Sequence, residues 1–166
     1  MSGEAHWNGI YATKTPDQLS WTQEAPATSL RFLREGHLPA GARVLDAGAG
    51  LGTLAEAILR ETEWSVTLAD LSAEALAKAE VRLGGSPRAA FRVGDLRTLD
   101  LGEGAFDAWH DRAVLHFLRE PADRAAYVAT LIRALKPGGV AVLAGFALDG
   151  PEKCSGLEVC PDAGGV

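Results

Sequence analysis

The chain of 166 residues contains only two cysteines, and this and other absences exclude several classes of function. Cys154 and Cys160 lie close together near the C-terminus, where a zinc site would need further ligands. No apolar run reaches the roughly 18 residues that span a membrane. The first residues have neither the basic nor the apolar region of a secretory signal. We therefore expect a cytoplasmic protein with free thiols, no metal site and no membrane partner.

The charge balance disfavours non-specific binding of nucleic acid over a broad surface. The net charge is −6, and the 16 lysine and arginine residues form no dense block, whereas nucleic-acid-binding proteins concentrate positive charge on one face. With 47% hydrophobic and 23% charged residues, the composition is that of an ordinary globular protein. The length suits one domain over residues 1–166, and we expect no nucleic-acid partner.

Three glycines at every second position follow a short apolar run. Gly48, Gly50 and Gly52 lie between an expected strand over residues 43–47 and an expected helix over residues 53–60. Glycines let the backbone turn tightly and approach a bound molecule closely. A dinucleotide loop normally reads G-x-G-x-x-G and rests a pyrophosphate on the helix N-terminus. Here the third glycine of that pattern would fall at Thr53.

The acid at the end of the first strand favours a different ligand. The carboxylate of Asp46 would repel a pyrophosphate. It would attract a ligand that carries an ammonium and a sulfonium group, as S-adenosylmethionine does. The loop therefore favours a methyl donor over NAD, and an NAD-dependent oxidoreductase is the less favoured alternative.

Strand-like and helix-like segments alternate along the rest of the chain. Nearly continuous apolar strands joined by helices are typical of a mostly parallel sheet covered on both faces. The fold class is therefore α/β, doubly wound. Ser72 is the expected N-cap of the third helix, and Gly84 follows its end. The expected strands are 43–47, 64–69, 89–93, 105–109 and 140–146, and the expected helices are 24–36, 53–60, 73–83 and 122–135, with a turn over 136–139.

Acidic residues follow four of the expected strands. In such sheets the ligand crevice lies beyond the carboxyl ends of the strands, where this sequence places Asp46, Asp70, Asp95 and the pair His110–Asp111. Asp70 could accept both hydrogen bonds from a ribose diol, and Asp95 could reach an exocyclic amine of adenine.

These motifs resemble those of the class I S-adenosylmethionine-dependent methyltransferases, over nearly the whole chain. Residues 44–52 resemble the first motif of that family, residues 106–116 the strand-four motif that flanks the methyl group, and residues 135–139 the turn before strand five. The resemblance implies a Rossmann-like methyltransferase fold with S-adenosylmethionine as cofactor. The cofactor-binding residues that it implies are Asp46, Gly48, Ala49, Gly50, Gly52, Asp70, Leu71, Asp95, Leu96 and His110.

The candidate catalytic residues are His110 and Asp111. Positioning supplies most of the rate of an in-line methyl transfer, and a general base is needed only where the acceptor must lose a proton. Either residue could be that base. In the alternative interpretation both shape the pocket while Arg112 pairs with an acid. His116 is expected on the following helix as a packed or capping residue.

Both ends of the chain resemble a narrower group of small bacterial methyltransferases of unassigned substrate. In that group a segment like residues 1–22 folds over the cofactor, which implies a substrate-contacting or lid role for Trp7, Tyr11 and Trp21. The alternative is that these aromatic residues only anchor the segment to the core over residues 23–146. Residues 146–157 resemble the same group.

The family pattern is not followed at the C-terminus. The family sheet usually continues past strand five with a helix and two antiparallel strands, whereas only 20 residues follow Phe146. We expect a fold truncated after strand five, with an irregular tail over residues 147–166. Strand five is then an edge strand, which favours a dimer through that strand or a monomer whose tail covers it. A non-catalytic relic is the second alternative to a methyltransferase whose acceptor, a small molecule or a protein, the sequence does not identify.

Overall fold

A five-stranded parallel sheet, in the order β3-β2-β1-β4-β5, forms the centre of the computed structural model. The structure describes residues 3–14, 18, 26–112 and 114–160. Trp21, one of the three residues predicted to contact substrate or form a lid, lies outside them. The strands are β1 (Arg43–Ala47), β2 (Ser65–Asp70), β3 (Ala89–Val93), β4 (Phe106–Arg112) and β5 (Leu135–Ala144).

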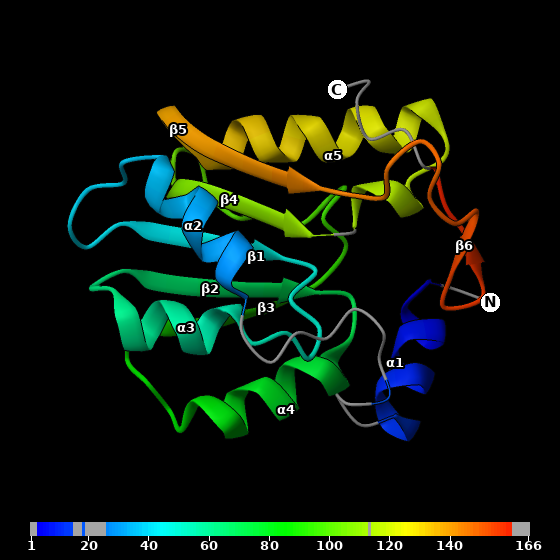
Figure 1. Ribbon diagram of the computed structural model, residues 1–166, viewed down its shortest axis with the longest axis horizontal. Coiled ribbons are helices and arrows are strands. Elements are labelled where there is room, and N and C mark those ends of the chain that lie inside the picture. The colour runs from blue at the N-terminus through cyan, green and yellow to red at the C-terminus, as the bar shows by residue number, and fades with distance from the viewer. Residues whose placement is uncertain (1–2, 15–17, 19–25, 113, 161–166) are drawn as a thin grey trace.

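Helices pack on both faces of this sheet (Figure 1). Side chains of α2 (Ala27–Glu35), α3 (Leu54–Glu61) and α4 (Ala73–Leu83) form one buried cluster with Val44 and Val66. Side chains of α5 (Pro121–Ala134) form a second cluster with Leu45 and Trp109 on the opposite face. Because successive strand residues point to opposite faces, cover on both sides explains why successive residues of β1 and β4 are buried. The predicted doubly wound α/β fold is confirmed.

The predicted helix caps around α4 are also confirmed. Ser72 Oγ accepts a hydrogen bond from the backbone N–H of Ala75, which satisfies one of the unpaired donors of the first turn. Gly84 ends the helix in the left-handed conformation, with φ of 59°.

Two boundaries differ from the sequence prediction. β4 continues to Arg112, so His110 and Asp111 lie within the strand rather than after its end. The predicted turn over residues 136–139 instead belongs to β5, which starts at Leu135. The ladder between β4 and β5 shifts its register there, because Phe106 pairs with Leu135 and Ala108 pairs with Val140. The three extra residues of β5 between these pairs form a bulge or irregularity where the turn was expected.

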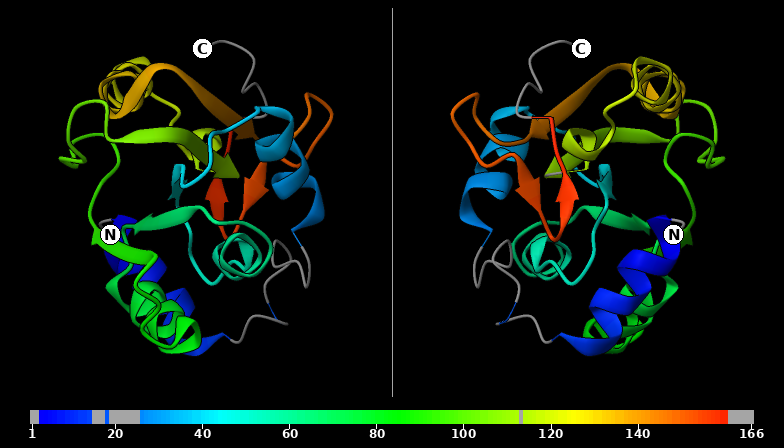
Figure 2. Two further views of the ribbon diagram at one scale, coloured as in Figure 1. Left: turned by 90° about the vertical axis from the view of Figure 1, so that its left-hand side faces the viewer. Right: turned by 90° about the vertical axis from the view of Figure 1, so that its right-hand side faces the viewer.

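Three further elements lie at the carboxyl end of the sheet. These are α1 (Gly3–Thr13), the short 3-10 helix η2 (Leu115–Phe117) and a hairpin of β6 (Lys153–Cys154) and β7 (Leu157–Glu158). The hairpin lies within the tail that was expected to be irregular. Figure 2 (right) shows it in front of the carboxyl ends of the strands, with α1 beside it.

β5 is an edge strand of the sheet, as predicted. Among the described residues, no helix is long and apolar enough to cross a membrane.

Candidate functional site

The glycine loop is held tightly against the neighbouring strand. The backbone N–H groups of Gly48 and Ala49 both donate to the carbonyl of Ala69, at 2.7 and 3.1 Å. Gly48 and Gly50 adopt positive φ values of 67° and 50°, which L side chains rarely adopt. A Cβ atom on Gly48 would lie 2.0 Å from Val114 Cγ2. Only glycine fits this turn, and other atoms can therefore approach its backbone closely.

Asp70 points back toward the glycine loop from the end of β2. Its Oδ2 accepts the N–H of Gly50 at 2.9 Å, and its Oδ1 accepts the N–H of Ser72 at 2.8 Å. Burial raises the pKa of this carboxyl to about 6, although the two N–H donors favour the charged form and the nearby carboxylate of Asp46 disfavours it. A buried acid therefore sits beside the loop, as the sequence predicted.

Asp46 and His110 face each other across β1 and β4 and form the centre of the site. His110 Nδ1 lies 2.9 Å from Asp46 Oδ1, and His110 Nε2 lies 2.9 Å from Ser29 Oγ. All three side chains are buried. A carboxylate can only accept hydrogen bonds, so the N–H of Nδ1 donates to Asp46, while Nε2 shares a hydrogen bond with the hydroxyl of Ser29. The three residues form a continuous hydrogen-bonded chain from β1 through β4 to α2.

Asp111 has different partners from its neighbour His110. Its carboxylate accepts the hydroxyl of Tyr127 at 2.5 Å and the N–H groups of Val114 and Leu115 at 2.7 and 3.1 Å. Burial raises its pKa to about 6 despite these donors. Asp111 thus caps the start of η2 and holds α5 through Tyr127. Its catalytic role stays a prediction, and every partner named here is structural.

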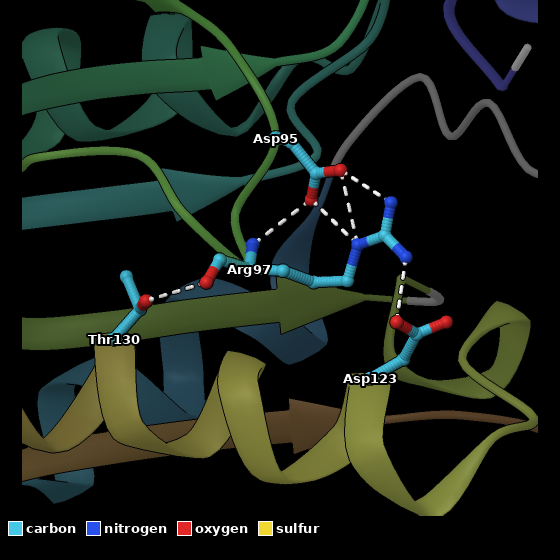
Figure 3. Close-up of polar contacts among 4 residues, drawn as sticks. All are labelled: Asp95, Arg97, Asp123 and Thr130. Atoms are coloured by element: carbon cyan, nitrogen blue, oxygen red, sulfur yellow. Dashed lines mark hydrogen bonds and ion pairs between the residues drawn. The ribbon is translucent and has the colours of Figure 1, made fainter.

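Asp95 is engaged by arginine rather than open to a ligand (Figure 3). Its carboxylate accepts hydrogen bonds from the side chain of Arg97, which also pairs with Asp123 on α5 at 2.7 Å. These hydrogen bonds hold the pKa of Asp95 below its ordinary value. An adenine amine would therefore share this carboxylate with Arg97. Leu96 is buried in the cluster under α5.

Seven of the predicted site residues line a small cavity of about 40 Å³. Tyr11 reaches it from α1, and its hydroxyl lies 2.6 Å from the position that a Cβ on Gly50 would occupy. Ligand pockets usually measure about 300–1,000 Å³, so this cavity, with Tyr11 over Gly50, is smaller than a nucleoside requires. Predicted residues that line the cavity are Tyr11, Asp46, Gly48, Ala49, Gly50, Gly52 and His110.

Other predicted residues lie outside the lining of this cavity. Trp7 stacks on Tyr11 at 5.9 Å between ring centroids, and half-buried Leu71 lies near the start of α1. Conversely, Ser29, Thr53 and Arg112 line the cavity without having been predicted as ligand-binding residues. Arg112 could have been found, because it directly follows His110 and Asp111. Nothing in the sequence indicates that Ser29 meets β4.

The donor set fits S-adenosylmethionine once α1 has moved. Asp46 lines the cavity with a carboxylate suited to an ammonium group, and the loop of positive-φ glycines forms a cradle that side chains would otherwise fill. Asp70 lies outside the cavity lining, beside the loop, and both of its oxygens accept backbone N–H groups. Among the described residues, no three metal-ligating side chains cluster.

Comparison with known proteins defines the class. The sequence profile of the family described as "Methyltransferase domain" matches residues 44–139. The chain therefore belongs to this methyltransferase family, whose members depend on S-adenosylmethionine. The matched region runs from β1 to the bulge in β5.

Individual relatives agree with this assignment. A 2-methyl-6-phytyl-1,4-hydroquinone methyltransferase of Synechocystis sp. is 32% identical over 108 residues, which cover 64% of the chain and 33% of that relative. An S-adenosylmethionine-dependent methyltransferase structure from Mesorhizobium loti matches with 30% identity and a TM-score of 0.59, over 71% of the chain and 52% of that structure.

The cyclase SpnF matches with 27% identity and a TM-score of 0.66, over 89% of the chain and 57% of that structure. The chain thus spans about a third to somewhat over half of these three relatives.

Proposed function

We propose that this domain binds S-adenosylmethionine at the carboxyl ends of β1, β2 and β4 and passes its methyl group to an acceptor. The observation that carries the proposal is the position of the Asp46 carboxylate, which lines the cavity together with the glycine loop and contacts His110. Asp46 would hold the ammonium group and Asp70 the ribose diol. The cofactor supplies a methyl group already activated on a sulfonium.

His110 is the residue best placed to hold a proton in this site. Asp46 fixes its Nδ1 as the donor, which leaves Nε2 directed at Ser29 Oγ, 2.9 Å away. An acceptor hydroxyl that displaces Ser29 at this atom would meet an oriented imidazole, as in other sites where a carboxylate orients a histidine. Tyr11 and α1 would then exclude water from the closed site.

Charge separates this proposal from dinucleotide binding. Two buried carboxylates, those of Asp46 and Asp70, flank the loop on which a pyrophosphate would have to rest. Both would repel it. Parallel titrations with S-adenosylhomocysteine and NADH distinguish the two ligands, and we expect saturable binding of the first alone.

The proposal also includes the chemical class of the methyl acceptor. The Synechocystis relative is named for a hydroquinone substrate, and a phenolic small molecule is the class of acceptor we favour here over a protein side chain. No nucleic acid is expected, because the net charge is −6.

We also propose that the edge of β5 pairs with a second copy or is covered within a monomer, which light scattering after size exclusion would distinguish.

Two assays test the proposal together. Calorimetry with S-adenosylhomocysteine tests cofactor binding, and transfer of a labelled methyl group to fractionated cell extract tests catalysis. Binding with transfer supports a methyltransferase, whereas binding without transfer supports the non-catalytic alternative. A folded protein that binds no cofactor contradicts the methyltransferase and leaves only a relic that has lost cofactor binding.

A further inference from the structure

His116 is a buried histidine without a hydrogen-bond partner. Its side chain is 1% exposed, and neither ring nitrogen finds a partner among the described residues. Burial lowers its pKa to about 4, so the imidazole is neutral at neutral pH. A neutral imidazole carries one donor and one acceptor. Native proteins leave few buried polar atoms unpaired, because each costs stability, so these two nitrogens call for an explanation.

Two aromatic rings contact this imidazole, and a third ring packs on one of them. Phe146, which follows β5, stacks on it with ring centroids 4.8 Å apart and planes 19° apart. Phe117 meets it edge-on at 4.3 Å, and Trp7 of α1 meets Phe117 edge-on at 5.2 Å. We call these four residues the aromatic cluster. It offers a flat ring a stacking surface and offers a polar group two ring nitrogens.

The aromatic cluster adjoins the glycine loop. Val114, two residues before His116, packs so closely on Gly48 that a Cβ there would lie 2.0 Å from Val114 Cγ2. Tyr11, which covers Gly50, stacks on Trp7 of the cluster. A molecule bound at His116 would therefore neighbour the site assigned to the cofactor.

The side of the cluster formed by Phe146 is held by few polar contacts. Phe146 is half-buried. Beyond it, the backbone N–H of Cys160 donates to the carbonyl of His116 at 2.7 Å, and His6 Nε2 lies 3.1 Å from the carbonyl of Ser155. Among the described residues, an exposed ion pair also joins Arg119 to Glu158, and such pairs contribute little. Phe146 lies two residues beyond the end of β5 and takes no part in the ladder of the parallel sheet.

We propose that His116 belongs to the acceptor-binding site and that the acceptor is a flat aromatic molecule with a hydroxyl or amino group. Its ring takes the place of Phe146 against the imidazole, and its polar group bonds a ring nitrogen of His116. This inference rests on the proposed function, because only a methyltransferase has a methyl acceptor. An uncharged group is favoured, because a charge would lose its hydration in this apolar surrounding. The role of His116 is binding, since His110 is the candidate base.

Nuclear magnetic resonance of protein with ¹⁵N-labelled histidine tests the contact directly. The four imidazoles are those of His6, His37, His110 and His116, and His116→Phe assigns the signal. Hydroquinone is the probe, with and without S-adenosylhomocysteine, and cyclohexane-1,4-diol is the matched probe without a flat ring. We expect hydroquinone to shift the His116 signals in a saturable way and the diol to leave them unchanged. Unmoved His116 signals, or equal shifts with both probes, overturn the proposal.

Thermal unfolding provides a second readout. If His116 serves binding at a cost in stability, His116→Phe removes two unpaired polar atoms and raises Tm by about 3 °C or more. The affinity for S-adenosylhomocysteine should change less than about twofold. The exposed control His37→Asn leaves Tm unchanged, because asparagine tolerates the left-handed backbone at this position. A lowered Tm in His116→Phe means that the histidine serves packing and overturns the proposal. Loss of cofactor binding by the wild type would instead contradict the proposed function alone.

Discussion

His110 Nδ1 lies 2.9 Å from Asp46 Oδ1, although 64 positions separate the two residues in the sequence. The contact follows from the sheet, because β1 and β4 are neighbours and their register pairs Asp46 with His110. Asp46 therefore has two tasks in our account. It presents charge to the cofactor, and it fixes which nitrogen of His110 carries the proton.

Replacing Asp46 by asparagine should weaken cofactor binding strongly. Asp46→Asn keeps the shape of the side chain but removes the charge that faces the ammonium group. We expect the affinity for S-adenosylhomocysteine to fall about tenfold or more, as for other charge-assisted hydrogen bonds. Calorimetry measures this. The control is Asp107→Asn at the start of β4, whose carboxylate accepts the N–H of Arg43 and pairs with Lys136. An equal loss in both variants would refute the assignment.

Asp70 should make cofactor affinity depend on pH. Its pKa is raised to about 6 by burial, so below pH 6 the folded protein holds a neutral acid that accepts hydrogen bonds poorly. We expect affinity for S-adenosylhomocysteine to fall as the pH drops through 6 in the wild type. Asp70→Asn should bind weakly at every pH. A wild-type affinity that stays flat between pH 7 and 5 would count against a ribose role for Asp70.

Asp70 should also make stability depend on pH, in the opposite direction to cofactor affinity. Its folded pKa lies above the unfolded value of roughly 3.9, so between about pH 4 and 6 the folded state binds the extra proton. The contribution of Asp70 to stability therefore rises as the pH falls from 7 toward 4. Thermal unfolding of wild type and Asp70→Asn at pH 7 and 5 checks this. Because the pKa of Asp111 is also raised to about 6, the difference between the variants is the informative quantity.

Gly48 should tolerate alanine much less well than Gly41 does. The two glycines have nearly equal φ values of 67° and 69°, but a Cβ on Gly41 would meet nothing within 4 Å. Both variants share the cost of an alanine at positive φ, about 1 kcal/mol. Gly48→Ala should lose about 1–3 kcal/mol more through its clash with Val114. Urea unfolding measures the difference, and Val114→Ala should restore part of it. Equal losses would show that the loop has room for a side chain.

Tyr11 should slow the entry of cofactor. Because its side chain fills the space above Gly50, the fraction of molecules open to ligand is reduced until α1 moves. Tyr11→Ala should raise the association rate of S-adenosylhomocysteine several-fold in stopped-flow tryptophan fluorescence. Ile10→Ala is the control, since Ile10 packs on the same cluster without lining the cavity. An unchanged rate in Tyr11→Ala would mean that the cofactor enters without moving Tyr11.

Tyr127→Phe should separate stability from binding. The variant removes the hydroxyl that donates to Asp111 at 2.5 Å and accepts from Trp109 Nε1 at 2.9 Å. Left without these bonds, the buried partners should cost about 1–3 kcal/mol of unfolding free energy. Cofactor affinity should stay within about twofold of wild type, if Asp111 is a structural cap. A large loss of affinity without loss of stability would restore a direct role for Asp111.

The fold could be predicted because its signals are local. Apolar strand runs, the N-cap at Ser72 and the glycine after α4 each act within a few residues. The bulge at the start of β5 could not be predicted, because it depends on how that strand pairs with β4. For the same reason the end of β4 was placed too early: His110 and Asp111 are polar, but they are buried and have partners on β1, α2 and α5.

The site was predictable only in part. Asp46, Asp70 and the glycine loop lie at strand ends, where parallel topology brings side chains together. The guanidinium of Arg97 on Asp95, the hydroxyl of Ser29 on His110 and the aromatic cluster around His116 all depend on long-range packing. Periodicity and spacing carry no information about such contacts.

The most direct test of the central claim is a calorimetric titration of the folded wild-type chain with S-adenosylhomocysteine. Our account predicts saturable binding in the micromolar range that Asp46→Asn weakens while Asp107→Asn does not. A chain that is folded by circular dichroism but gives no binding heat at any accessible ligand concentration would contradict it.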